Sequence, residues 1–86
     1  MATIELLYFA RLRESLGLER ERLVLPEAVS TAGALRLFLS GRGEVWAREL
    51  DPQKVIRIAV NQDLAEPSQV LADGDEVALF PPVTGG

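Results

Sequence analysis

The fold is decided by Glu76-Val77-Ala78-Leu79-Phe80-Pro81-Pro82, where an apolar strand runs into two prolines. The preceding Asp73-Gly74-Asp75 is a strong turn signal, so a strand is expected to begin at about residue 76. Proline cannot donate to a strand ladder, so the pair ends the strand and sends the chain out of the sheet. We therefore expect a folded domain over residues 1–80 and an extended tail over residues 81–86.

Two further segments carry the main hydrophobic patterns. Residues 4–9 are apolar and aromatic with little alternation, as in a strand buried on both faces. Ser30 or Thr31 can cap a helix that runs to about residue 40. The spacing of apolar residues in this helix predicts a buried stripe formed by Leu35, Phe38 and Leu39. Arg36 is expected to point away from that stripe.

Shorter elements are indicated by turn and breaker residues between these segments. They are a helical turn closed by Gly17, an outer strand ending at Pro26, a short helix carrying Trp46, a strand over residues 55–60 and an extended segment around Leu64.

The first and last strands are the most apolar, so they are expected to pair at the centre of the sheet. A parallel pair needs a crossover connection, which the one long amphipathic helix can cover. The result is an α+β fold of the β-grasp, or ubiquitin-like, type: a mixed sheet with one main helix on one face. The opposite face keeps apolar groups, and exposed apolar patches usually mark a partner site.

Alternation assigns residues to the two faces of this sheet. Val77 and Leu79 point one way, and the set of Glu76, Ala78 and Phe80 points to the open face. By the same logic Glu5, Leu7 and Phe9 of the first strand share the open face. The alternative is that Phe80 and Phe9 are residues at the edge of the core.

Composition excludes several classes of function. The 86 residues contain no cysteine and no histidine, which removes disulfides, the usual metal sites and Cys/His or Ser/His nucleophilic catalysis. The formal net charge of −4 argues against a nucleic-acid surface. No apolar run is long enough for a membrane span, and the N-terminus lacks the pattern of a signal peptide, so a cytoplasmic location is expected.

The terminal pair Gly85-Gly86 has two interpretations. Chain ends are often poorly ordered, so the pair can be a simple frayed terminus. Alternatively, the missing side chains let the backbone enter a narrow channel, where the terminal carboxylate is modified.

Four blocks in this order resemble the small subunits of molybdopterin synthases, the sulfur carriers of molybdenum-cofactor biosynthesis. The blocks are Phe9-Ala10-Arg11-Leu12-Arg13-Glu14, Ala59-Val60-Asn61-Gln62, Asp73-Gly74-Asp75-Glu76-Val77-Ala78 and Pro81-Pro82-Val83-Thr84-Gly85-Gly86. The segment from residue 41 to residue 54 matches nothing specific.

The resemblance implies a role for the tail. Gly86 would be adenylated with ATP by a ubiquitin-activating-like adenylyltransferase, and a sulfur donor protein would convert it to a thiocarboxylate. The tail would then enter the large synthase subunit and give its sulfur to cyclic pyranopterin monophosphate. No permanently bound cofactor and no metal are implied. The tail residues concerned are Pro81, Pro82, Val83, Thr84 and Gly85.

The resemblance also implies a contact with the large subunit. Phe80 would lie in it, with Ala78, Leu7 and Phe9 on the same face. Arg13 would offer a cation near the base of the tail, although a solvated surface charge explains it equally well.

Three alternatives stay open at this point. The chain could carry sulfur for thiamine or for a thiolated tRNA base, or it could be a ubiquitin-like protein modifier that forms isopeptide bonds. A stand-alone enzyme fits least, because the expected catalytic groups would lie on the large subunit.

Overall fold

The computed structural model describes residues 2–82. The predictions on Val83, Thr84, Gly85 and Gly86 lie outside the described residues. The elements in chain order are β1 (Thr3–Tyr8), α1 (Ala10–Leu16), β2 (Arg20–Val24), α2 (Ala32–Ser40), α3 (Glu44–Glu49), β3 (Arg57–Val60), β4 (Asp63–Leu64) and β5 (Glu76–Phe80).

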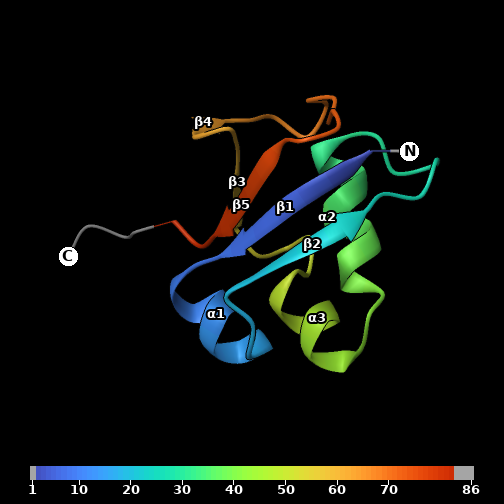
Figure 1. The fold of residues 1–86 in the computed structure, drawn as a ribbon. Coiled ribbons are helices and arrows are strands. Elements are labelled where there is room, and N and C mark those ends of the chain that lie inside the picture. The colour runs from blue at the N-terminus through green and yellow to red at the C-terminus, as the bar shows by residue number, and fades with distance from the viewer. Residues whose placement is uncertain (1, 83–86) are drawn as a thin grey trace.

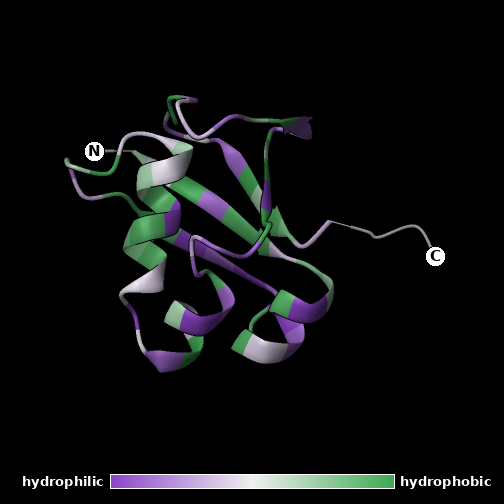
Figure 2. Ribbon diagram, turned by 180° about the vertical axis from the view of Figure 1, so that it is seen from behind, coloured by the Kyte–Doolittle hydropathy of each residue, from purple (hydrophilic) through white to green (hydrophobic). Residues whose placement is uncertain are grey.

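The strands form one five-stranded sheet in the order β2-β1-β5-β3-β4. The parallel pair β1 and β5 lies at its centre, as predicted, and every other neighbouring pair is antiparallel. Figure 1 shows the sheet in front of α2, with α1 and α3 next to each other below the sheet in this view. Seen from behind in Figure 2, α2 lies over the sheet. The β-grasp architecture is confirmed.

The core lies between the sheet and α2. β1 buries every second residue, with Ile4, Leu6 and Tyr8 almost fully enclosed, while Leu7 on the other face is partly exposed. The expectation that this strand is buried on both faces was therefore wrong. One helical layer can cover only one face, so the apolar residue on the other face stays accessible.

Helix α2 begins where the sequence predicted. The hydroxyl of Thr31 accepts a hydrogen bond from the backbone N–H of Ala34 at 3.2 Å, which is an N-cap. Leu35 and Leu39 are buried, whereas Phe38 is only partly covered at the edge of the stripe.

Arg36 corrects the expectation that this side chain simply points away into solvent. It is half-buried, and its guanidinium donates hydrogen bonds to the backbone oxygens of Leu50, Asp51 and Lys54 at 3.2, 2.5 and 2.8 Å. Burial lowers the pKa of Arg36, and the nearby Asp51 carboxylate opposes that change. One side chain of α2 therefore holds the loop that follows α3.

Strand β3 begins at Arg57, two residues later than predicted. Its ladder with β5 starts at the pair Arg57–Phe80, where β5 ends. Pro81 has no N–H with which to extend the ladder, so Val55 and Ile56 have no strand partner on that side.

Candidate functional site

An apolar row crosses the open face of the sheet. The ladder registers place Leu7 beside Ala78, Ala78 beside Ala59, and Ala59 beside Leu64, so four strands contribute to one line. Directly paired residues point to the same face of a sheet. The placement of Ala78 and Leu7 on the open face is confirmed, and the row ends in Leu64, whose side chain is 71% exposed.

Sequence reasoning missed Leu64 as a member of this face. β4 has only two residues, and its register is set by the tight connection through Asn61 and Gln62, which both have positive φ values. No periodicity can be read from two residues. The Asn61-Gln62 turn signal was the one available clue that the chain folds back here.

Two aromatic residues lie toward the tail end of the same face. Phe80 is the last residue of β5 and is partly exposed, with Arg57 beside it in the ladder. Phe9 follows β1, has an extended backbone and is 45% exposed. Phe80 occupies the face predicted for it, and neither residue is fully enclosed in the core.

The other end of the face is charged. The Glu5 carboxylate pairs with Arg20 at 2.8 Å and with Arg22 at 3.6 Å, and the neighbour of Glu5 in β5 is Glu76. Polarity therefore changes along the strands. Apart from Arg57, the part of the face closest to Pro81, where the tail begins, is apolar.

Arg13 lies in the last turn of α1, which starts directly after Phe9. Its side chain is exposed, and within residues 2–82 the structure gives it no ion pair. Among the described residues, α1 thus carries an exposed cation outside any ion pair, on the helix that begins directly after Phe9.

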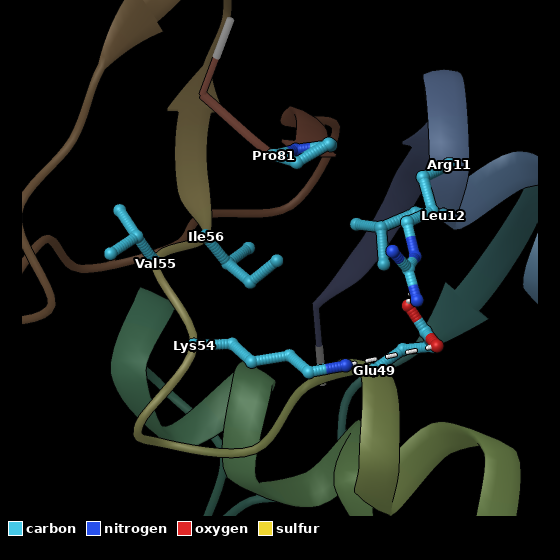
Figure 3. A pocket seen from close by; sticks show the side chains of 7 residues that line it. All are labelled: Arg11, Leu12, Glu49, Lys54, Val55, Ile56 and Pro81. Atoms are coloured by element: carbon cyan, nitrogen blue, oxygen red, sulfur yellow. Dashed lines mark ion pairs between the residues drawn. The ribbon is translucent and has the colours of Figure 1, made fainter. Parts of the chain in front are cut away.

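A cavity of about 230 Å³ lies at the root of the tail. Figure 3 shows its apolar wall, formed by Leu12 of α1, Val55 and Ile56 of the loop before β3, and Pro81. No sequence pattern pointed to this cavity, because its wall comes from three segments far apart in the chain.

The polar side of the cavity is built on Glu49, the last residue of α3. This carboxylate is only 3% exposed, and three cations surround it: Arg48 at 3.3 Å, Arg11 at 3.4 Å and Lys54 at 3.8 Å. Arg11 and Lys54 reach it from α1 and from the loop after α3 (Figure 3). The segment 41–54, unassigned from sequence, therefore supplies the base of this cluster.

A second, partly buried network joins β1, β2 and the chain between α2 and α3. The hydroxyl of Tyr8 donates to Glu21 at 2.7 Å, and Arg42 donates two hydrogen bonds to the same carboxylate at 2.7 and 3.0 Å. Arg42 also lies over the ring of Trp46. Burial raises the pKa of Tyr8, as does its bond to Glu21. Burial alone would raise the pKa of Glu21, but the hydrogen bonds from Arg42 and Tyr8 lower it.

Within residues 2–82 the structure holds no group of three or more acidic side chains that could bind a metal ion. Over the same residues no helix has the length and apolarity needed to cross a bilayer.

Comparisons with known proteins agree with this geometry. Residues 6–86 match the model of the ThiS family. The molybdopterin synthase sulfur carrier subunit of Escherichia coli is 41% identical over 83 residues, which cover 96% of this chain and 99% of that protein.

Solved structures support the same relationship. SAMP1 from Haloferax volcanii superposes with a TM-score of 0.79 at 30% identity, covering 99% of this chain and all of that chain. The structure of the complex of subunits 1 and 2 of molybdopterin-converting factor from Helicobacter pylori gives a TM-score of 0.68 at 28% identity, covering 98% and 99% of the two chains. The chain therefore belongs to the ThiS family.

Proposed function

We propose that this chain is the sulfur carrier subunit of a molybdopterin synthase, with Gly86 as the residue that carries sulfur. The observation that carries the proposal is similarity over 96% of the chain to proteins with that name, together with a match to the ThiS family model that runs through residue 86. The absence of cysteine supports it, because the terminal carboxylate is then the natural position for transferable sulfur.

The chemistry requires activation by another protein. A terminal carboxyl group has a pKa of about 3.3–3.7, so at neutral pH it is an anion and a poor electrophile. Attack of this carboxylate on the α-phosphorus of ATP releases pyrophosphate and gives an acyl adenylate. Sulfur at the level of hydrosulfide then displaces AMP and leaves a thiocarboxylate. A ubiquitin-activating-like adenylyltransferase and a sulfur donor protein would supply these two steps.

The open face supports docking onto a large subunit. The row from Leu7 to Leu64 and the aromatic residues Phe9 and Phe80 offer an apolar surface next to the start of the tail. A partner that covers this surface is positioned to receive residues 83–86. The Helicobacter pylori complex shows that a structurally similar chain does assemble with a second subunit.

Intact-mass measurement tests the proposal. The chain is incubated with its cognate adenylyltransferase, ATP and a sulfur source. We expect one oxygen-to-sulfur exchange, located at Gly86 by fragmentation. Deleting Gly86 should abolish the exchange and leave the melting temperature unchanged, because Gly86 follows the last strand. Sulfur located elsewhere on the chain, or Gly86 found only in isopeptide bonds to lysines, would contradict the proposal.

A further inference from the structure

The cavity at the root of the tail has the features of a docking pocket for a protein partner. Its volume of about 230 Å³ is below the ~300–1,000 Å³ usual for sites of drug-sized ligands, so one inserted side chain suits it better than a nucleotide or a pterin. Its wall is apolar, and Val55 at its margin is 62% exposed. An exposed β-branched residue beside a cavity favours an apolar occupant.

The ion cluster around Glu49 is opposite in sign to the chain as a whole. Three cations surround the single Glu49 carboxylate, a net charge of +2 on a chain whose total is −4, and two of them, Arg11 and Lys54, line the pocket itself. Glu49 is nearly inaccessible, whereas Arg11 and Lys54 are substantially exposed. An approaching partner therefore meets the cations and not the carboxylate.

The pocket is held in shape from two sides. Arg36 fixes the loop carrying Lys54 and Val55 through three backbone hydrogen bonds, and Glu49 ties that loop to Arg11 of α1. The site is thus formed before any partner arrives, which lowers the entropic cost of binding.

The position of the pocket indicates which partner would contact it. Phe80 on the open face and Pro81 in the pocket wall are consecutive residues. A protein that covers Phe80 and takes the chain beyond Pro82 must pass close to the pocket.

We infer that this pocket receives an apolar side chain from an acidic segment of the large subunit, with Arg11 and Lys54 pairing with the carboxylates of that segment. The inference rests on the proposed function. It adds a second contact with the large subunit, on the other side of the start of the tail from the open face of the sheet. Complementary charge of this kind sets the register of a complex and its rate of formation.

A matched pair of variants tests the charge requirement. Val55→Asp and Val55→Lys remove the same apolar contact and change the charge at the pocket margin in opposite directions. We expect Val55→Asp to bind the large subunit at least about tenfold more weakly than Val55→Lys, with the gap closing at high salt. Arg22→Glu, at the far end of the open face, should stay within about twofold of the wild type. Trp46 fluorescence verifies that each variant is folded.

Zero-length cross-linking gives an independent readout. Lys54 is the only lysine of the chain, so a carbodiimide should join it to an aspartate or glutamate of the large subunit in a single mapped peptide. Lys54→Arg keeps the charge and should remove that product. Equal affinity of the two Val55 variants together with no Lys54 cross-link would overturn the inference, as would a charge effect confined to the adenylyltransferase. Phe80→Ala in the same assay separates the two proposals, because it reports on the sheet face alone.

Discussion

Phe80 and Leu79 are neighbours in one strand with opposite surroundings. Leu79 is fully buried in the core, whereas Phe80 is partly exposed on the open face. Because successive side chains of a strand point to opposite faces, Leu79 belongs to the core and Phe80 to the proposed partner surface.

Truncating each of these two residues should therefore give opposite results. Phe80→Ala should lower the affinity for the large subunit about thirty-fold, equivalent to ~2 kcal/mol, and lower the free energy of unfolding by less than that. Leu79→Ala should cost about 2–5 kcal/mol of folding stability. Urea unfolding and calorimetric titration measure the two quantities. A large stability loss with unchanged affinity for Phe80→Ala would place it in the core.

Leu64 and Leu37 form a second matched pair, since both are 71% exposed but lie on different elements, β4 and α2. Leu64 ends the apolar row of the sheet, and Leu37 is on the outside of α2. Leu64→Glu should weaken large-subunit binding at least about tenfold, because a charge would be buried in an apolar contact. Leu37→Glu should leave it unchanged. Both variants should stay within ~0.5 kcal/mol of wild-type stability. Equal binding by both would remove Leu64 from the interface.

At the scale of elements, Glu21 links β2 to β1 and to the segment between α2 and α3. Its carboxylate accepts from Tyr8 and from Arg42, and the fold lowers its pKa despite burial, which opposes that change. A carboxyl group whose pKa is lower in the folded state stabilises the protein above its unfolded-state pKa. That contribution disappears as the pH falls through the folded-state value.

Glu21→Gln should therefore flatten the acid limb of the stability curve. The wild type should lose free energy of unfolding below roughly pH 4.3 more steeply than the variant, while at pH 7 the variant should be the less stable protein. Urea unfolding monitored by Trp46 fluorescence between pH 7 and pH 3 gives both curves. Two parallel curves would show that the carboxylate of Glu21 adds nothing to the pH dependence.

The elements that the sequence predicted well are those with local signals. The Thr31 cap, the left-handed Gly17 that closes α1 and the turn before β5 all depend on residues close in the chain. β3 was predicted two residues too long because its start depends on where its partner β5 ends. Arg36 was misjudged because its three acceptors lie 14 to 18 residues away.

For the whole molecule, the pairing of β1 with β5 and the identity of the open face followed from hydrophobicity and alternation. The pocket at the tail root did not, because α1, the loop before β3 and Pro81 meet only after folding. The role of Glu49 could not be predicted from the sequence either. In sequence it is one of many charged residues, and only the tertiary structure surrounds it with cations.

The central claim is that this chain gives sulfur to a pterin through Gly86. A single-turnover reaction tests it most directly, with thiocarboxylated chain, large subunit and cyclic pyranopterin monophosphate, followed by intact mass. Sulfur carriage predicts that the chain returns to the carboxylate mass while the pterin gains one sulfur for each chain discharged, so that two chains are consumed for each molybdopterin dithiolene formed. A chain that keeps its sulfur, or loses it to water without sulfur appearing on the pterin, would contradict the claim.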